Sequence, residues 1–272
     1  MSDQNRDLVL TPEDIGIIRK ILLAIPKDML LSESVRRYVA QRRWEKDRKK
    51  HLEIFQHQNL GAMPGTIEHN RRELDEALFG SSKRTLRLLH PLTALEPCYS
   101  RPEETRVLSI GPRTEMELLH LIGLGFDMNK VRAVDLISCS PWIDLGDMHQ
   151  LPYPDKSFDV VLSSWVLNYS NQPQLAVDEM CRVCVDGGLI AIGLTYDPKF
   201  GRHHISNAPG EKDIVGSMQR SAADLADLIG DRLIQICFQD EPQRDDEKGA
   251  VMLIARIKHW SRSTRFANNA AS

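Results

Sequence analysis

The chain has 272 residues and a net charge of −3, with 42% hydrophobic and 27% charged residues. This balance excludes a mostly disordered chain and gives no sign of a dedicated polyanion-binding protein. No apolar run approaches the ~20 residues that a membrane-spanning helix needs, and the polar first residues lack the apolar stretch of a secretory signal. The five cysteines are scattered and odd in number, so they do not indicate a disulfide framework. We therefore expect a cytoplasmic protein.

The chain changes character near residues 97–104, where a helical pattern gives way to alternating strands and helices. Thr11, Pro12 and Asp14 have the spacing of a helix start. Helices are predicted over residues 11–25, 32–55, 66–79 and 82–89. We therefore predict a helical lid or substrate lobe over residues 1–100, a cofactor-binding domain over 101–260 and a flexible tail over 261–272.

The second helical segment is strongly basic and contains Arg36, Arg37, Arg42, Arg43, Lys46, Arg48, Lys49 and Lys50. A solvated helix face is the simplest interpretation. The alternatives are a face that meets an anionic small substrate or a membrane surface, and a nucleic-acid patch. No aromatic stacking platform is interleaved with these residues, which disfavours nucleic acid. We expect a small-molecule acceptor.

After residue 104, short apolar runs alternate with helical segments. Strands are predicted over 106–110, 131–135, 158–163, 189–194, 233–238 and 250–257, and helices over 115–125, 174–185 and 221–230. This alternation predicts a doubly wound, Rossmann-like α/β sheet. Because no helix separates the last two strands, they should pair as a hairpin and leave the final strand antiparallel in an otherwise parallel sheet.

Cys181 and Cys184 form a C-x-x-C pair inside a predicted helix. No second pair and no cluster of histidines accompanies them, so metal or redox chemistry is disfavoured. We expect two buried side chains that behave as small hydrophobic groups, and no metal site.

In an open α/β sheet the ligand lies beyond the carboxyl ends of the strands. Gly111 follows the first strand and permits a tight turn, and the next helix offers its free N–H groups. A dinucleotide fingerprint would need glycines where Arg113 and Met116 stand, which argues against a nicotinamide dehydrogenase.

Two acidic positions are the strongest candidates for a nucleoside site. Asp135 ends the second strand, where a carboxylate can accept hydrogen bonds from both ribose hydroxyls. Asp147 can accept from an adenine amino group while Met148 packs on the ring. An ordinary loop acid and a polar loop with a buried methionine are the alternatives. Ser164 and Trp165 leave the third strand where a transferred group would sit.

The run from Asp147 to Val161 resembles the D-x-x-x-L-P-[FY]-x-D-x-S-F-D-x-V signature of class I S-adenosylmethionine-dependent methyltransferases of the small-molecule type. Residues 107–115, 131–135 and 182–189 are similar to three further motifs of that family. The resemblance covers about a third of the chain closely. It implies a seven-stranded sheet and S-adenosyl-L-methionine as cofactor, bound by Gly111, Asp135, Asp147, Met148 and the Ser164–Trp165 region.

The first motif departs from the family pattern. It usually opens with an acid and has two or three glycines, whereas here Ser109 is followed by Gly111 alone. Two explanations stay open. Either Arg113, Thr114 or Glu115 takes over in holding the methionine end of the cofactor, or cofactor binding is weakened and the domain is a catalytically inactive scaffold.

The expected activity is methyl transfer to an oxygen, less favourably a nitrogen, of a small acceptor that is anionic or sugar-linked. An acceptor of high pKa needs a general base, and His203 and His204 are the candidates because they follow the 189–194 strand. The helical lobe should cap the cleft and exclude water. An RNA methyltransferase is a third possibility, disfavoured because the N/D-P-P-[FY] motif of such enzymes is replaced by Ser163-Ser-Trp165.

Overall fold

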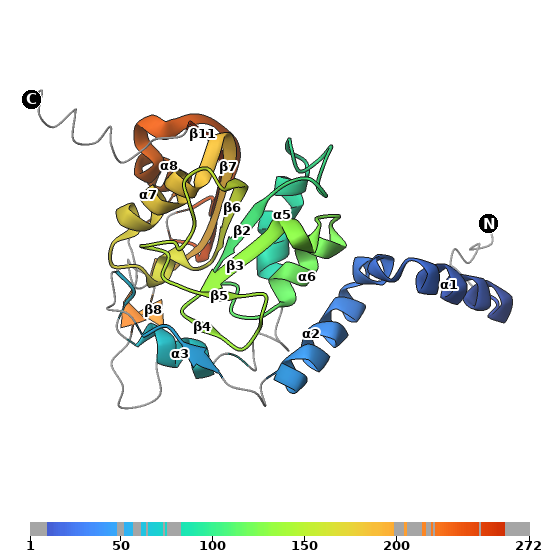
Figure 1. Ribbon diagram of the computed structural model, residues 1–272. Coiled ribbons are helices and arrows are strands. Elements are labelled where there is room, and N and C mark those ends of the chain that lie inside the picture. Colours follow the sequence, from blue (N-terminus) through green and yellow to red (C-terminus); the bar gives the residue numbers. More distant parts are fainter. Residues whose placement is uncertain are drawn as a thin grey trace, which may run out of the picture.

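The computed structural model describes residues 10–47, 52–56, 61–63, 65–72, 74, 83–198, 204–205, 214–215, 219, 221–244 and 246–258. A seven-stranded sheet in the order β10-β11-β7-β6-β2-β3-β5 forms its centre (Figure 1). The strands are β2 (Val107–Ile110), β3 (Val131–Asp135), β5 (Asp144–Leu145), β6 (Phe158–Ser164), β7 (Cys184–Tyr196), β10 (Leu233–Asp240) and β11 (Gly249–Ile257). The predicted Rossmann-like α/β class is confirmed.

Strand direction follows the predicted pattern. Strands β5, β3, β2, β6 and β7 run parallel to one another. The last strand, β11, is antiparallel to both β7 and β10, between which it lies. The predicted terminal hairpin is therefore confirmed. Strand β7 begins at Cys184, five residues before the predicted start, and Cys184 pairs with Phe158.

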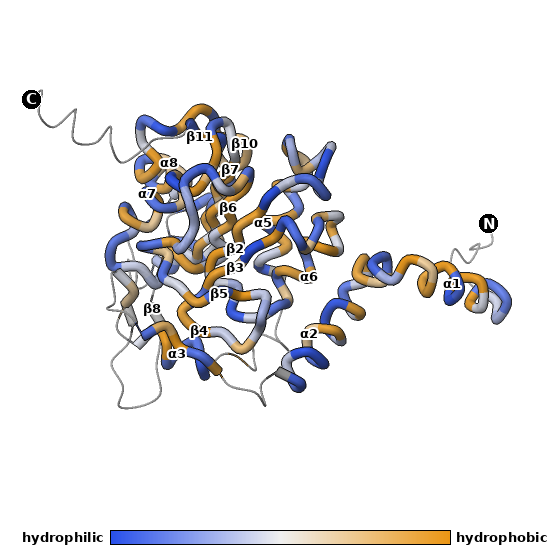
Figure 2. The backbone as a smooth tube through the Cα atoms, in the orientation of Figure 1, coloured by the Kyte–Doolittle hydropathy of each residue, from blue (hydrophilic) through white to orange (hydrophobic). Residues whose placement is uncertain are grey.

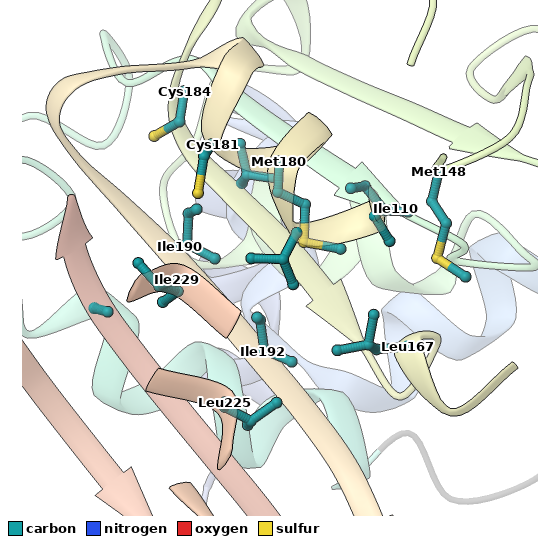
Figure 3. Close-up of a cluster of buried hydrophobic side chains, with 14 of the residues drawn as sticks. Ile110, Met148, Leu167, Met180, Cys181, Cys184, Ile190, Ile192, Leu225 and Ile229 are labelled. Carbon is teal, nitrogen blue, oxygen red and sulfur yellow. The ribbon is translucent and has the colours of Figure 1, made fainter. Parts of the chain in front are cut away.

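Helices cover both faces of the sheet (Figure 1). On one face α7 (Pro173–Val183) and α8 (Ala222–Ile229) pack on the strands, and Figure 3 shows the apolar side chains that join them. On the other face α5 (Lys83–Thr93) and α6 (Met116–Gly123) form a second core cluster. Figure 2 shows how hydrophobic residues concentrate along the central strands, as expected for strands buried on both faces.

The cysteine pair belongs to the first core cluster. Cys181 lies on α7 and Cys184 begins β7, and both side chains are buried and form no disulfide bond. Burial raises the pKa of Cys181 to about 12 and also raises the pKa of Cys184. Such thiols carry no thiolate at neutral pH, so their role is packing, as predicted.

The N-terminal region consists of α1 (Pro12–Ala24), η1 (Pro26–Leu31), α2 (Glu33–Asp47) and α3 (Thr66–Arg72). The capping box predicted at Thr11 and Asp14 is present. Helix α2 ends at Asp47 instead of continuing to residue 55, because β1 (Glu53–Ile54) pairs with β4 (Ile137–Ser138). Helix α5 continues through Pro91, beyond its predicted end. None of the described helices combines the length and apolar character that crossing a bilayer requires.

Helix α2 is tied to the sheet domain rather than solvated on all sides. Ala40 and Trp44 pack against Met116 and Leu119 of α6 in a third buried cluster. Arg36 is buried and donates to the carbonyl oxygens of Leu30 and Leu31. Part of the basic character of this segment therefore serves packing, while Arg48, Lys49 and Lys50 lie outside the described residues.

Short elements complete the fold. They are η2 (Met128–Lys130), η3 (Leu167–Tyr169), η4 (Gly230–Arg232), β8 (His204–Ile205) and β9 (Ile214–Val215). Strands β8 and β9 pair with each other and not with the main sheet. The predicted tail, residues 261–272, lies outside the described residues.

Candidate active site

A cleft of about 480 Å³ opens at the carboxyl ends of β2, β3 and β6. The parallel strands bring to this edge several segments that are far apart in the sequence. Of the predicted cofactor contacts, the lining includes Gly111, Arg113, Asp135, Asp147, Met148, Ser164 and Trp165. It also includes Ala62, Thr66 and Asn70 from the N-terminal region and Arg84 and Thr85 from α5.

Asp135 stands at the end of β3 with only 5% of its surface exposed. Its carboxylate accepts hydrogen bonds from the backbone N–H groups of Arg113 (2.9 Å) and Ile137 (3.3 Å). Burial raises its pKa, and the bond from the Arg113 N–H acts in the opposite direction. The arrangement fixes a hydrogen-bond acceptor at the point where the first loop meets the second strand.

The first loop turns sharply in front of Asp135. Gly111 has φ of +65°, and a Cβ at this position would lie 2.6 Å from the Val166 side chain. Arg113 also adopts positive φ, +59°, and donates through Nη2 to Asn70 Oδ1 at 2.9 Å. The single glycine is therefore required by both conformation and space, and Arg113 ties the loop to α3.

Asp147 is held by a buried polar chain. His149 donates its backbone N–H to Asp147 Oδ1 at 3.0 Å, and its Nδ1 lies 2.5 Å from the same oxygen. His149 Nε2 lies 2.6 Å from Ser170 Oγ. A Cβ on Gly61 would strike the His149 ring. His149 therefore fixes Asp147 and the neighbouring N-terminal segment, and Met148 lies beside them in the cleft wall.

Ser164 and Trp165 close β6 at the opposite end of the cleft. Trp165 has φ of +60°, donates from its indole Nε1 to Thr195 Oγ1 at 3.0 Å, and lies against Gly193. The Arg84 guanidinium carbon is 5.7 Å from the centre of the Trp165 ring, within the range of a cation–π interaction. Ser164 donates to Thr85 Oγ1 at 3.3 Å.

Glu115 does not line the cleft. Its carboxylate forms an ion pair with Arg43 of α2 and accepts a hydrogen bond from Ser140. The Arg43 guanidinium also lies over the Trp142 ring, 3.6 Å from its centre. The carboxylate therefore joins α2 to the sheet domain, and the geometry does not support the expectation that Glu115 holds a cofactor.

The two candidate bases are not placed in the cleft. His203 lies outside the described residues, and of His204 the structure describes the backbone strand β8 but not the side chain. A role as general base therefore stays a prediction for both histidines.

Sequence reasoning missed two polar residues on the buried face of α6. Glu117 and His120 both line the cleft and are 5% and 1% exposed. Burial lowers the pKa of His120 to about 4, so its ring is neutral at pH 7. The sequence contains a pattern that could have revealed them, because two polar residues three positions apart in an otherwise apolar helix lie on the same face. The run Met116-Glu-Leu-Leu-His was predicted only as part of a helix over residues 115–125.

A second pair was missed because its members are 100 residues apart. His69 Nε2 of α3 lies 3.1 Å from the Tyr169 hydroxyl, and the two rings are stacked. Burial is the main reason that the pKa of His69 falls to about 4. Tyr169 lines the cleft, so this pair attaches α3 to its rim.

Comparison with known proteins agrees with this geometry. Residues 122–192 match the family model described as a methyltransferase domain. The match begins after the first loop, which is the part that departs from the family pattern. In fold, the chain is similar to a chain in the structure of the Haloferax volcanii Trm112 methyltransferase activator complexed with a methyltransferase, with a TM-score of 0.52, 17% identity and coverage of 74% of this chain and 99% of the other.

Two curated relatives are malonyl-[acyl-carrier protein] O-methyltransferases. The protein from Halorhodospira halophila is 32% identical over 171 residues, which cover 57% of this chain and 55% of the relative. The protein from Coxiella burnetii is 28% identical over 128 residues, which cover 47% and 41%. The aligned part thus spans about half the length of these relatives or less. The fold, the family model over residues 122–192 and the carboxylates at the sheet edge all agree with the class I S-adenosylmethionine-dependent methyltransferase domain that the sequence motifs indicate.

Proposed function

We propose that this protein transfers a methyl group from S-adenosyl-L-methionine to an oxygen, less favourably a nitrogen, of a small anionic acceptor. One observation carries the proposal. A single cleft contains the carboxylates that a nucleoside requires, Asp135 and Asp147, and also two guanidinium groups suited to an anion, Arg84 and Arg113.

The residues present fit the cofactor. Asp135 would accept from the ribose hydroxyls, and Asp147 would accept from the adenine amino group beside Met148. The turn at Gly111, which leaves no room for a side chain, lets the backbone approach closely. When bound, S-adenosylmethionine supplies a methyl group on a positively charged sulfur that a nucleophile displaces in line. The protein's own contribution is then mainly to position the two reactants.

The N-terminal region is proposed to cover the acceptor side of this cleft. Ala62, Thr66 and Asn70 line it, and Asn70 accepts from Arg113 while His69 contacts Tyr169. These contacts place α3 over the loop that follows β2. A segment in this position excludes water and contacts the acceptor, which is the role proposed for residues 1–100.

A carboxylate is the acceptor group that best fits both the site and the relatives. The two relatives are named for methyl transfer to an oxygen of a malonyl group carried by a protein. A carboxylate is already ionised at neutral pH, so no side chain has to remove a proton. A general base, for which His203 and His204 stay candidates, is needed only if the acceptor is a hydroxyl.

The experiment is a methyl-transfer assay with radiolabelled S-adenosylmethionine and three thioesters: malonyl, malonyl methyl ester and acetyl. The proposal predicts that label enters only the malonyl thioester and is released as methanol by base, as from a methyl ester. Equal labelling of the acetyl thioester would contradict a carboxylate acceptor. If the native chain binds no S-adenosylmethionine at millimolar concentration, the proposed activity itself is wrong.

A further inference from the structure

Glu117 is a buried carboxylate that the proposed function has not yet used. It lies in the first turn of α6, is 5% exposed and lines the cleft. Glu117 contacts residues of β2 and of the neighbouring strand β6. Asp135 and Asp147 lie at the ends of β3 and β5, on the other side of β2 in the strand order. The cleft therefore has acidic groups at two ends that are supplied by different elements.

Three hydroxyl groups surround the Glu117 carboxylate. Ser109 Oγ of β2 donates to Glu117 Oε1 at 2.5 Å, and Thr85 Oγ1 of α5 donates to Oε2 at 3.1 Å. Ser164 of β6 donates to Thr85 Oγ1, and its hydrogen bonding lowers the pKa of Glu117. Hydroxyls from three elements thus converge on one carboxylate and hold it in a defined orientation.

The surroundings supply hydrogen bonds to Glu117 but no positive charge. Among the described residues, no lysine, arginine or histidine forms an ion pair with it, and the nearby charge that acts on it is the anion Asp135. A buried carboxylate without a cation is costly. Burial accordingly raises the pKa of Glu117 from 4.5 to about 7. Such a group in a cleft is typical of a position completed by a charged ligand.

We propose that Glu117 binds the α-ammonium group of the cofactor's methionine moiety. The inference rests on the proposed function, since it requires S-adenosylmethionine in this cleft. With the nucleoside at Asp135 and Asp147, the amino-acid end would lie on the side of Gly111 where Ser164 and Glu117 line the cleft. The sulfonium has no N–H to donate, whereas an ammonium has three donors. Glu117 is therefore matched to the ammonium.

This assignment also explains the serine in the first motif. Ser109 stands where the family usually has an acid, and its hydroxyl is only 2.5 Å from the Glu117 carboxylate. Two carboxylates at that separation would not both ionise. The negative charge is therefore supplied by the helix instead of the strand, and Ser109 hydrogen-bonds it. Neither Arg113, Thr114 nor Glu115 is needed for this role.

The test is a calorimetric comparison of two ligands at pH 8. One is S-adenosylhomocysteine, and the other is its deamino analogue, in which hydrogen replaces the amino group and the carboxylate and nucleoside are kept. The native chain should prefer S-adenosylhomocysteine about tenfold or more, the effect of a charge-assisted hydrogen bond. Glu117→Gln should lose that preference and bind the deamino analogue within about twofold of the native chain. Glu115→Gln, which removes a carboxylate outside the cleft, should keep the preference.

An equal loss of affinity for both ligands in Glu117→Gln would overturn the inference while leaving cofactor binding intact. If the native chain binds neither ligand, both the proposed function and the inference are overturned.

The pH dependence of the ligand preference of the native chain provides a test that does not require the variant to fold. Its preference for S-adenosylhomocysteine should fall as the pH is lowered from 8 to 6, because Glu117 becomes protonated. The other charged or titratable groups that line the cleft are Arg84, Arg113, His120, Asp135, Asp147 and Tyr169. His120 stays neutral between pH 6 and 8 because its pKa is about 4, and the guanidinium groups do not titrate in this range. The same comparison with Glu117→Gln, which keeps all of these groups, should show no such fall. A preference that does not change with pH would contradict the assignment.

Discussion

The two ends of the cleft are built in different ways. At the nucleoside end, Asp135 is the last residue of β3, and Asp147 follows β5 and begins the run that carries the family signature. At the other end, Glu117 comes from a helix and is oriented by hydroxyls from β2, α5 and β6. The first end depends on local sequence and the second on contacts between distant segments. A missing acid in the first motif is therefore compatible with an intact site, because a carboxylate from another element can take its place.

The largest expected effect concerns stability at the Glu117 end. The folded-state pKa of Glu117 is about 7 against 4.5 for an ordinary glutamate. The folded chain therefore holds a proton that the unfolded chain releases between these values. This contribution to stability is complete below pH 4.5 and is lost as the pH rises through 7. Glu117→Gln, which cannot ionise, should be more stable than the native chain at pH 8 by up to about 3 kcal/mol.

Thermal or urea unfolding at pH 5 and pH 8 measures this difference, which should nearly vanish at pH 5. Glu115→Gln is the matched control and should lower stability at both pH values, because Glu115 is paired with Arg43. A Glu117→Gln variant that is less stable than the native chain at pH 8 would show that the carboxylate serves the fold.

Gly111 lies between the two ends, and Gly111→Ala should damage both. The substitution combines positive φ with a Cβ placed 2.6 Å from Val166. We expect a loss of about 2 kcal/mol in stability and equally weaker binding of S-adenosylhomocysteine and its deamino analogue. Gly187→Ala is the matched control, since Gly187 has φ of +75° with open space around it. It should cost about 1 kcal/mol and leave binding unchanged, and equal effects of the two variants would contradict the role of the Val166 contact.

Ser170→Ala tests the nucleoside end alone. It removes the hydroxyl that contacts His149 Nε2 at 2.6 Å and accepts from the Gln172 N–H at 3.0 Å. Loss of these bonds should reduce stability by about 1 kcal/mol. It should also lower the affinities for S-adenosylhomocysteine and its deamino analogue by the same factor, because Asp147 is held through His149. Calorimetry decides this point. Weaker binding of S-adenosylhomocysteine alone would mean that the two ends are not independent.

Arg84→Gln should have the smallest effect, confined to the acceptor. Arg84 lies over Trp165 at the rim of the cleft and is exposed. An exposed charge pair contributes about 1 kcal/mol or less, so KM for an anionic acceptor should rise about fivefold with kcat little changed. Steady-state kinetics with the malonyl thioester provide the measurement. An unchanged KM would remove Arg84 from the acceptor site.

Much of the fold was predictable because its core strands are short apolar runs. The ranges 131–135 and 158–163 correspond closely to β3 and β6, which are buried on both faces. The end of α2 was wrong because pairing of β1 with β4 depends on residues more than 80 positions away. Strand β5, with only two residues, carries no periodic signal. That β11 inserts between β7 and β10 is likewise a property of the sheet and not of its sequence.

The site was predictable where a residue and its neighbours share one segment. Asp135 was identified from its position at a strand end and Asp147 from the motif that it begins, and the structure brings both to the cleft. Arg113, Thr114 and Glu115 were considered as substitutes for the missing acid, and Glu117 was not considered. The start of α6 directs the carboxylates of Glu115 and Glu117 to different sides. The contact of His69 with Tyr169 joins segments 100 residues apart. No local pattern reveals such a contact.

The most direct test of the central claim is a calorimetric titration of S-adenosyl-L-methionine into the native chain and into Asp135→Ala. The account predicts saturable binding with one site by the native chain. It also predicts an affinity about 100-fold lower for the variant, which has lost a charged acceptor for two ribose hydroxyls. Equal affinity in both proteins would contradict the placement of the cofactor in this cleft.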